Sequence, residues 1–290
     1  MVIYFNGKMI KKEDARVSVF DHGLLYGDGV FEGIRSYDGL VFKLAEHIER
    51  LYASAQGISL VIPLDKREME KAVLATLKAN RLKDAYIRLV VTRGEGDLGL
   101  DPRNCVKPTI FIIAGKIALY PAEVYKKGLK IVTVATRRNT PESLNPQIKS
   151  LNYLNNILGK IEAINAGVPE AIMLDQNGFV TECTGDNIFM VKGRLLITPP
   201  VSAGVLNGIT RQAVLDVASK AGLQAQERMI SRFDLFTSDE VFLTGTAAEV
   251  VPVVMMDGRL IASGTVGRYT QALIREFKKL TRKDGVRYAV

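Results

Sequence analysis

Strand-like and helix-like segments follow one another along this chain without the regular strand–helix–strand alternation that builds a parallel sheet. Runs of β-branched and other apolar residues predict short strands, and apolar residues at helical spacing predict helices. The predicted strands are residues 2–5, 40–42, 86–92, 109–114, 129–136, 171–174 and 240–244, with a strand-rich stretch at 179–197. The predicted helices are residues 44–55, 66–80, 151–166 and 209–221, and a closing helix from 266 onward. This order predicts an α+β or mixed α/β architecture.

The periodic pattern loosens between residues 116 and 128, where Pro121 and Gly128 interrupt it. A chain of 290 residues can form one large domain or two modest ones. We therefore predict a small N-terminal α/β domain at residues 1–116, an interdomain linker at 117–128 and a large C-terminal domain at 129–290.

Composition indicates an ordinary globular protein, because 47% of the residues are apolar and 24% are charged. No segment approaches the run of roughly 20 apolar residues that a membrane span needs, and residues 1–17 have no apolar signal-peptide core. Cys105 and Cys183 form no CxxC pair and are too few for a disulfide scaffold. We expect a cytoplasmic location.

The net charge of +8 suits either nucleic-acid binding or a basic surface that attracts anionic small molecules. The basic residues from Arg275 to Arg287 follow an apolar helical pattern and indicate a solvated helix end. No zinc-finger, RRM or KH motif is present, so no nucleic-acid partner is expected. His22 and His47 are the two histidines, which excludes a histidine-rich metal site, and we expect no metal.

Residues 94–99, GEGDLG, match the G-x-G-x-x-G fingerprint of dinucleotide-binding folds. That site needs a helix directly after the glycines, because the helix N-terminus holds the pyrophosphate. The following residues, LDPRNCVKPTI, contain two prolines and lead into another strand. We predict a glycine-rich loop near a ligand rather than a dinucleotide site.

Lys149 directly precedes a predicted helix with apolar residues at 151, 154, 158 and 161, a spacing that predicts one buried face. A lysine beside such a core is partly desolvated, which lowers the pKa of its amine and makes it a nucleophile or a base. The alternative is a solvated surface lysine.

Gly208, Ile209 and Thr210 open the predicted helix 209–221. Backbone N–H groups and a hydroxyl at a helix start suit a phosphate group, although an ordinary threonine N-cap has the same sequence. Thr246 follows the strand 240–244 and precedes two alanines, which gives a second turn of small residues.

Seven segments together resemble the branched-chain aminotransferases among the fold-type IV enzymes that use pyridoxal 5′-phosphate (PLP). They occur in the same order and span nearly the whole chain: HGLLYGDGVFEGIR (22–35), EHIERLYASA (46–55), YIR (86–88), IKSLNYLNNIL (148–158), TECTGDNIF (181–189), LNGITR (206–211) and TGTAAEVVPV (244–253). The resemblance implies a two-domain fold-type IV aminotransferase with PLP in the large domain. It implies at least a homodimer, and hexamers also occur in this family. The implied binding partners are small-molecule amino acids and 2-keto acids.

The implied activity is the transfer of an amino group from leucine, isoleucine or valine to 2-oxoglutarate, as in branched-chain amino-acid biosynthesis. The resemblance implies a ping-pong aldimine/ketimine mechanism, with Lys149 as the Schiff-base lysine and proton shuttle. Glu182 would face the pyridine nitrogen, Tyr153 the ring hydroxylate and Arg50 the phosphate. The other implied cofactor-binding residues are Leu206, Gly208, Ile209, Thr210 and Thr246.

The residues implied to bind substrate are Tyr26, Phe31, Gly33, Tyr86, Arg88, Leu98, Leu100, Tyr120, Thr246 and Ala247. Leu98 and Leu100 lie in the glycine loop, which in this family reaches the neighbouring subunit's site. Arg88 is expected to meet the second carboxylate of glutamate, with a cross-strand salt bridge as the structural alternative.

D-amino-acid aminotransferases and aminodeoxychorismate lyases of the same fold are alternatives. Tyr153, Arg88 and a glycine loop without histidine favour the branched-chain enzyme.

Overall fold

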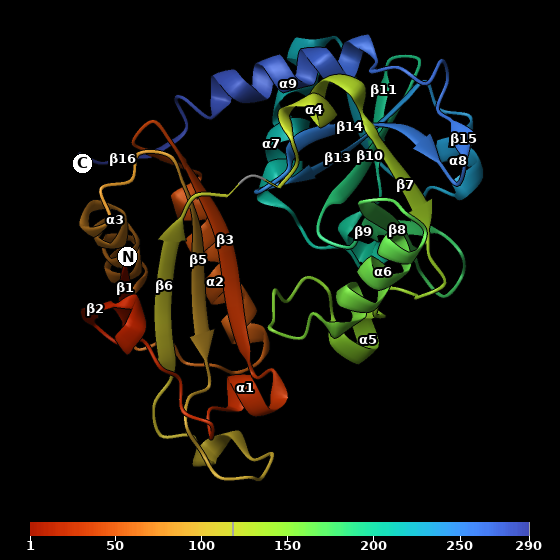
Figure 1. Ribbon diagram of the computed structural model, residues 1–290. Coiled ribbons are helices and arrows are strands. Elements are labelled where there is room, and N and C mark those ends of the chain that lie inside the picture. Colours follow the sequence, from red (N-terminus) through yellow and green to blue (C-terminus); the bar gives the residue numbers. More distant parts are fainter. Residues whose placement is uncertain (118, 290) are drawn as a thin grey trace. The chain divides into compact units, whose positions relative to one another are not determined.

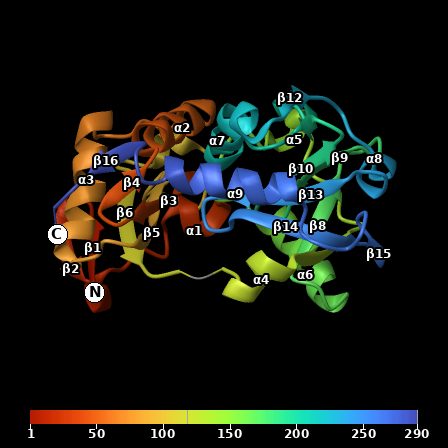
Figure 2. The same cartoon turned by 90° about the horizontal axis from the view of Figure 1, so that it is seen from above.

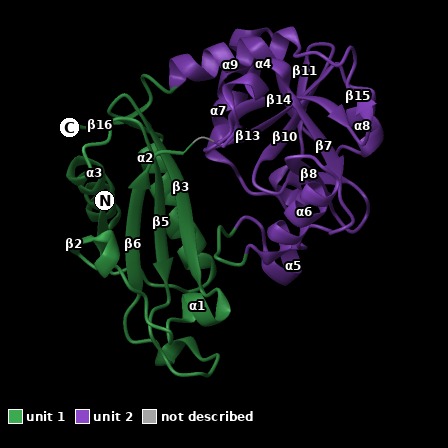
Figure 3. Ribbon diagram, viewed as in Figure 1, with its two compact units in different colours: residues 1–117, 148–152, 281–290 green, residues 118–147, 153–280 purple. Residues whose placement is uncertain are grey.

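The structure is a computed structural model that describes residues 1–117 and 119–289, and it divides into two compact units (Figures 1 and 3). Unit 1 comprises residues 1–117, 148–152 and 281–290, and unit 2 comprises residues 118–147 and 153–280. The predicted boundaries assign residues 148–152 and 281–290 to the C-terminal domain, whereas these segments belong to unit 1 in the structure. The predicted linker 117–128 contains a helix, α4 (Ala122–Lys127). Positions 118 and 290 of the predicted linker and C-terminal domain lie outside the described residues.

Within the described residues, unit 1 has a seven-stranded sheet in the order β16-β4-β3-β5-β6-β1-β2, and neighbouring strands run antiparallel. The strands are β1 (Val2–Phe5), β2 (Lys8–Lys11), β3 (Gly29–Tyr37), β4 (Leu40–Phe42), β5 (Ala85–Thr92), β6 (Thr109–Gly115) and β16 (Gly285–Arg287). The helices are η1 (Lys12–Asp14), α1 (His22–Tyr26), α2 (Leu44–Gly57), α3 (Lys66–Ala79) and η2 (Pro102–Asn104).

Helices α2 and α3 pack against each other and against the sheet of unit 1 (Figure 1). Leu44, Ile48 and Leu51 recur at helical spacing on α2 and are all buried in the core. Helix α3 begins at a capping box, in which Asp65 Oδ1 accepts from the Glu68 N–H and Glu68 Oε2 accepts from the Asp65 N–H, both at 2.7 Å. These helices correspond closely to the predicted ones.

Unit 2 has, among its described residues, a mixed sheet in the order β12-β11-β10-β13-β14-β7-β8-β9, with β15 paired to β14. The strands are β7 (Leu129–Thr133), β8 (Glu170–Leu174), β9 (Val180–Cys183), β10 (Asn187–Lys192), β11 (Leu195–Thr198), β12 (Gln224–Glu227), β13 (Glu240–Gly245), β14 (Glu249–Met256) and β15 (Arg259–Leu260). The β7–β8, β7–β14 and β11–β12 pairs are parallel, and the others are antiparallel.

The helices of unit 2 pack around this sheet, and α9 lies against β13 and β14 (Figure 2). Besides α4, they are α5 (Pro141–Leu144), α6 (Leu154–Asn165), η3 (Val201–Ala203), α7 (Ile209–Val217), η4 (Ala218–Ala221), α8 (Arg232–Phe236) and α9 (Arg268–Leu280). The predicted helix 209–221 is thus α7 followed by a 3₁₀ turn. No helix among the described residues is long and apolar enough to cross a membrane.

Strands β3 and β14 were not predicted. Their residues are buried on both faces almost throughout, so they show little of the apolar–polar alternation that indicates a half-exposed strand.

The predicted burial of residues 151, 154, 158 and 161 was wrong. Leu154, Leu158 and Ile161 are exposed, and Leu151 is half-buried and lies outside α6. Helical spacing shows that an apolar face exists, but it does not show which side of the helix the rest of the chain covers. Here the rest of unit 2 packs against the other face of α6.

Candidate active site

Lys149 lies in a short segment fixed to β3 and α2 of unit 1. Its carbonyl accepts from the Phe31 N–H at 3.0 Å, and the Leu151 N–H donates to the Gly29 carbonyl at 2.9 Å. The Lys149 N–H donates to Ser54 Oγ on α2 at 3.1 Å. The half-buried side chain carries its Nζ atom 4.6 Å from the centre of the Phe31 ring. Lys149 is thus partly desolvated by residues of unit 1, and not by the predicted buried face at residues 151, 154, 158 and 161.

Four predicted substrate residues come together on the β3–β5 strand pair. Gly33 and Arg88 are opposite each other in the strand register. The Arg88 guanidinium lies 4.6 Å from the centre of the Phe31 ring, and its Nη2 donates to the Tyr86 hydroxyl at 3.0 Å. A Cβ atom at Gly33 would lie 2.2 Å from that hydroxyl, so glycine makes room for it. Arg88 has no carboxylate partner among the described residues, which argues against the salt-bridge alternative.

Arg50, the predicted phosphate ligand, is held by a buried carboxylate that the sequence reasoning missed. Glu32 Oε1 accepts from Arg50 Nε and Glu32 Oε2 from Arg50 Nη2, both at 2.8 Å. His47 Nδ1 lies 2.7 Å from Glu32 Oε2, and because a carboxylate only accepts, His47 is the donor. His47 and Arg50 stand one turn apart on α2 and face β3. One feature of the sequence could have indicated this buried carboxylate. A histidine and an arginine lie on the apolar side of the predicted helix 44–55, where each needs a polar partner.

The electrostatics of this cluster favour an ionised Glu32 and a neutral His47. Burial by itself raises the pKa of Glu32, but the charges and hydrogen bonds of Arg50 and His47 outweigh it and lower the pKa to about 2. Burial lowers the pKa of His47, and the positive charges of Arg50 and Lys149 add to this effect against the opposing effect of Glu32. Glu32 and Arg50 therefore form a buried ion pair, and His47 adds a neutral hydrogen bond.

Tyr26, Leu98 and Leu100 form a second group in unit 1, around the glycine loop. The Tyr26 hydroxyl donates to the Leu98 carbonyl at 2.5 Å, and His22 Nε2 lies 2.8 Å from the Asp97 carbonyl oxygen. Helix α1 thus holds one side of the loop, while the Leu98 and Leu100 side chains are exposed. Among residues 94–108 the one helical turn is η2, so no α-helix follows the glycines, as predicted.

Glu182 lies on β9 of unit 2, buried in a hydrogen-bonded cluster. Its Oε1 accepts from Arg138 Nε at 2.9 Å, and its Oε2 accepts from Asn187 Nδ2 at 3.2 Å and from the Leu206 N–H at 3.0 Å. A carboxylate offers about four acceptor positions, so these bonds leave one on Oε1. The sequence reasoning missed Arg138 and Asn187, because Arg138 is separated from Glu182 by 44 positions and shares no motif with it.

The predicted phosphate-binding segment opens α7 next to this cluster. Gly208 is the N-cap residue, and no side chain caps the helix. The N–H groups of the first turn, at Ile209 and Thr210, therefore have no side-chain acceptor from the cap. A Cβ atom at Gly208 would lie 2.1 Å from Asn187 Oδ1, and Asn187 Nδ2 donates to the Leu206 carbonyl at 2.9 Å. Asn187 thus connects Glu182 to the start of α7.

The remaining predicted residues of unit 2 lie on connections. Thr246 and Ala247 occupy the turn between β13 and β14 and are half-buried, and Tyr153 directly precedes α6. Tyr120 precedes α4 and packs against the core of unit 2. Its hydroxyl is buried and has no hydrogen-bond partner among the described residues.

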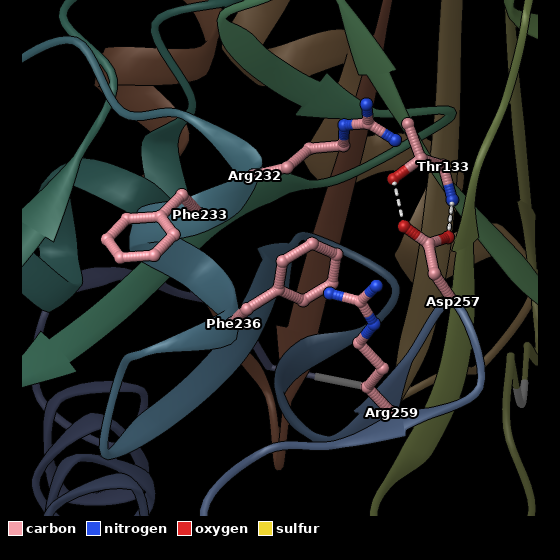
Figure 4. Close-up of a pocket in the computed structure, with 6 residues that line it drawn as sticks. All are labelled: Thr133, Arg232, Phe233, Phe236, Asp257 and Arg259. Carbon is pink, nitrogen blue, oxygen red and sulfur yellow. Dashed lines mark hydrogen bonds between the residues drawn. The ribbon is translucent and has the colours of Figure 1, made fainter.

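A cavity of about 500 Å³ in unit 2 is lined by none of the predicted site residues (Figure 4). Its lining residues are Thr133, Arg232, Phe233, Phe236, Asp257 and Arg259. The Asp257 carboxylate accepts from the Thr133 N–H and hydroxyl, and the Arg259 guanidinium lies 4.5 Å from the centre of the Phe236 ring. In the part of the chain that the structure describes, no group of three or more His, Cys, Asp or Glu side chains could hold a metal ion.

Comparison with known sequences identifies one family over most of the chain. The sequence model of amino-transferase class IV matches residues 29–255. A putative branched-chain-amino-acid aminotransferase of Methanocaldococcus jannaschii is 56% identical over 287 residues, which are 99% of each chain. The branched-chain-amino-acid aminotransferase of Escherichia coli is 36% identical over 281 residues, 95% of this chain and 91% of the relative.

Comparison with solved structures identifies the same family. The crystal structure of the Escherichia coli branched-chain amino acid aminotransferase superimposes with a TM-score of 0.93 at 36% identity, covering 96% of this chain and 93% of the other. The branched-chain aminotransferase of Thermoproteus uzoniensis, solved with norvaline, superimposes with a TM-score of 0.91 at 36% identity, covering 98% and 95%. The enzyme of Thermobaculum terrenum, solved in its PLP form, has a TM-score of 0.87 at 29% identity and coverage of 98% and 94%. These matches confirm the predicted family, the mixed two-domain fold class and the transaminase activity: the chain belongs to the amino-transferase class IV family and, within it, to the branched-chain amino acid aminotransferases.

Proposed function

We propose that this enzyme transfers the amino group of L-leucine, L-isoleucine or L-valine to 2-oxoglutarate, giving branched-chain 2-keto acids and L-glutamate. The observation that best supports this substrate pair is that two cationic groups lie close to the Phe31 ring. Arg88 and Lys149 each lie 4.6 Å from the centre of its ring. An aromatic ring suits an aliphatic side chain, and a guanidinium suits a carboxylate.

PLP is the cofactor of this enzyme, and each unit by itself carries polar groups that suit a part of it. Bound PLP supplies an electron sink that stabilises negative charge at the α-carbon of the substrate. Lys149, beside an aromatic ring and half-buried, is the amine that we assign to hold PLP covalently. Glu182 has one acceptor position left on Oε1, which suits a protonated ring nitrogen. Its bond from the Arg138 guanidinium favours the ionised carboxylate that such a contact needs.

The phosphate group fits two features described above. The first turn of α7 offers the N–H groups of Ile209 and Thr210 without a side-chain cap, and the helix dipole favours an anion there. Arg50 is oriented by Glu32, which accepts from its Nε and Nη2 atoms, and a guanidinium suits a phosphate. We assign Arg50, Ile209, Thr210 and the Thr246 hydroxyl to the phosphate. Leu206 and Gly208 would shape the phosphate-binding segment at the start of α7. Tyr153 would hydrogen-bond the ring hydroxylate of PLP.

Once the substrate amine has displaced it, Lys149 would carry a proton from the α-carbon, acting as a base and then as an acid. This role requires an amine that reaches a fixed carbon atom. The hydrogen bonds of the Lys149 backbone to Phe31 and Ser54 fix the origin of its side chain. In the second half of the cycle, the same amine would return a proton to the α-carbon of the product glutamate.

The substrate side must accept both an apolar side chain and a carboxylate. Phe31 would pack against the aliphatic chain, with Leu98 and Leu100 supplied by the loop of a neighbouring subunit. Arg88 would bind the second carboxylate of glutamate; it is fixed by the Tyr86 hydroxyl, for which Gly33 leaves space. The Thr246–Ala247 turn would receive the α-carboxylate. The Tyr120 hydroxyl, which has no partner among the described residues, would find one in a bound ligand. Tyr26 would position the loop through the Leu98 carbonyl.

We propose that the enzyme works in the cytoplasm as a homodimer or a larger homo-oligomer. Cys105 and Cys183 are both free thiols, which suits a reducing compartment. The exposed Leu98 and Leu100 suit a loop that packs against a second subunit.

The test is a steady-state assay of glutamate formation from each of the three L-amino acids with 2-oxoglutarate. Lys149→Ala should lower kcat by at least about four orders of magnitude, because it removes both the nucleophile and the proton carrier. Lys66→Ala, which removes an exposed lysine of α3, is the matched control and should leave kcat unchanged. Near-normal turnover by Lys149→Ala would refute the assignment. Glutamate formed from D-amino acids only, or pyruvate released from aminodeoxychorismate, would instead favour one of the two alternative activities.

A further inference from the structure

The cavity of Figure 4 lies within unit 2, where the end of β7, helix α8 and the β14–β15 hairpin meet. We call it the α8 cavity, and its six lining residues are those given above. None of them is a candidate active-site residue. Its volume of about 500 Å³ lies within the range of roughly 300–1,000 Å³ that is typical of small-molecule sites. The α8 cavity is therefore large enough for a ligand of its own.

The backbone around the α8 cavity is fixed by hydrogen bonds on two sides. Helix α8 begins at a capping box, in which Ser231 Oγ accepts from the Asp234 N–H at 3.3 Å and Asp234 Oδ2 accepts from the Ser231 N–H at 2.8 Å. On the other side, the Asp257 carboxylate accepts from the Thr133 N–H at 2.6 Å and from the Thr133 hydroxyl at 2.8 Å. These bonds fix the segments from which the lining side chains extend, so the cavity is formed before a ligand binds.

Two arginine side chains border the α8 cavity, and neither has a carboxylate partner among the described residues. They are Arg232 on α8 and Arg259 on β15. Figure 4 shows the Arg259 guanidinium beside the Phe236 ring, 4.5 Å from its centre. By contrast, Arg228 lies 3.5 Å from a carboxylate of α8. Two guanidinium groups at the cavity are thus left to bind an anion.

The charge of the lining favours an anion. Asp257 is the one carboxylate among the six lining residues, and Figure 4 shows it directed to Thr133, which donates two hydrogen bonds to it. The lining therefore carries two positive charges against one negative, on a chain whose net charge is +8. Guanidinium groups bind carboxylates and phosphates through paired N–H···O hydrogen bonds. The net positive charge of the chain attracts the same ligands.

The α8 cavity also has an apolar wall. Phe233 and Phe236 are three residues apart on α8, and both border the cavity. The Phe233 side chain is 72% exposed, so a ligand that covers it removes apolar surface from water. A bare inorganic ion would leave this ring uncovered. The lining therefore suits a ligand that combines an anionic group with an apolar part.

We propose that the α8 cavity binds a small organic anion, in which a carboxylate or phosphate group is joined to an apolar or aromatic part. Arg232 and Arg259 bind the anionic group, and Phe233 packs against the apolar part. Phe236 holds the Arg259 guanidinium in place through its ring. This site is additional to the proposed function and depends on none of the residues assigned there.

The test is isothermal titration calorimetry of the PLP-loaded enzyme with phenyl phosphate and with benzoate. We expect a Kd below about 1 mM for at least one of these probes, and the tighter one identifies the anionic group. Inorganic phosphate, acetate and phenol each carry one half of this chemistry and should bind at least about tenfold more weakly than the tighter probe. Failure of both probes to bind, or equally tight binding of inorganic phosphate or acetate, would overturn the proposal.

Substitutions locate the binding. Arg232→Gln/Arg259→Gln should raise the Kd of the tighter probe at least about tenfold, because two charge-assisted contacts are lost. Arg194→Gln/Arg275→Gln is the matched control, since it removes two exposed arginines of unit 2 outside the cavity. It should change the Kd by less than about twofold. A Kd that the first double variant leaves unchanged would place the probe elsewhere and overturn the proposal.

A measurement on the wild-type enzyme keeps the proposal falsifiable if the double variant fails to fold. Phenylglyoxal modifies exposed arginine side chains, and peptide mass spectrometry gives the rate at each position. With the tighter probe at about ten times its Kd, the site is about 90% occupied. Labelling of Arg232 and Arg259 should then slow at least about fivefold, while labelling of Arg194 stays unchanged.

Unchanged labelling of Arg232 and Arg259 in the presence of the probe would overturn the proposal. The transamination assay is independent of these results, because the α8 cavity shares no residue with the assigned active site. The proposed function and this inference therefore fail separately.

Discussion

Replacing Glu32 by Gln should destabilise the protein by about 3 kcal/mol, although the substitution preserves the size of the side chain. The pairing with Arg50 and His47 lowers the pKa of the buried Glu32 from 4.5 to about 2. A shift of this size corresponds to about 3 kcal/mol of stability at neutral pH, at about 1.4 kcal/mol per pKa unit. Removing one partner of a buried ion pair typically costs about 3–5 kcal/mol, because the other charge stays buried without compensation. The pKa shift and the general cost of breaking a buried ion pair therefore both give a loss of about 3 kcal/mol.

The sign of the pH dependence follows from the direction of this shift. The pKa of Glu32 is lower in the folded than in the unfolded protein, so its contribution is complete above pH 4.5 and is lost as the pH falls toward 2. About 1 kcal/mol should be gone by pH 3.5. The difference between wild type and Glu32→Gln should therefore narrow below pH 4.5 and stay constant between pH 5.5 and 7.

The assay is urea unfolding followed by circular dichroism, at one protein concentration, with saturating cofactor and at several pH values. Glu49→Gln is the matched control on the same helix, because Glu49 forms an exposed ion pair with Lys66. The control should change the free energy of unfolding by no more than about 0.5 kcal/mol. A loss below about 1 kcal/mol for Glu32→Gln, or a difference from wild type that does not narrow below pH 4.5, would refute the account of this cluster.

Substitutions at two further residues test the rest of the site. Arg88→Ala should lower kcat/KM for glutamate and 2-oxoglutarate at least about tenfold more than for leucine. The reason is that only the substrates with a second carboxylate lose a charge-assisted contact. Equal losses of kcat/KM for both substrate classes would contradict this role. Arg138→Met leaves the buried Glu182 carboxylate without its cation and should cost about 3 kcal/mol in urea unfolding and at least about tenfold in kcat. Arg138→Lys should restore part of both, and an unchanged kcat in Arg138→Met would exclude a link between Arg138 and the chemistry.

Local patterns predicted much of the fold. The start of α7 at Ile209 and the strand β5 follow from glycine positions and β-branched runs that act over a few residues. The resemblance of seven short segments predicted the family, since it depends on motif order and not on packing.

The sequence did not predict the residues that fix the candidate site residues in place. Glu32 meets Arg50 across 18 positions and Arg138 meets Glu182 across 44, and such partners are identified only once the strands and helices are placed. The prediction that the apolar face of α6 is buried was wrong for a related reason. Contacts distant in the sequence lie on the side of α6 that faces unit 2, such as the hydrogen bonds of Glu162 to the segment after β7, and the helical period does not reveal them.

The most direct test of the central assignment is the visible absorption spectrum of the purified enzyme before and after L-leucine is added without any keto acid. If Lys149 holds PLP and L-leucine is a substrate, the absorption band of the lysine-bound cofactor should convert to that of pyridoxamine phosphate. An equimolar amount of the branched-chain keto acid should appear, and 2-oxoglutarate should restore the original band. A coloured enzyme that L-leucine leaves unchanged would contradict the assignment of branched-chain L-amino acids as substrates.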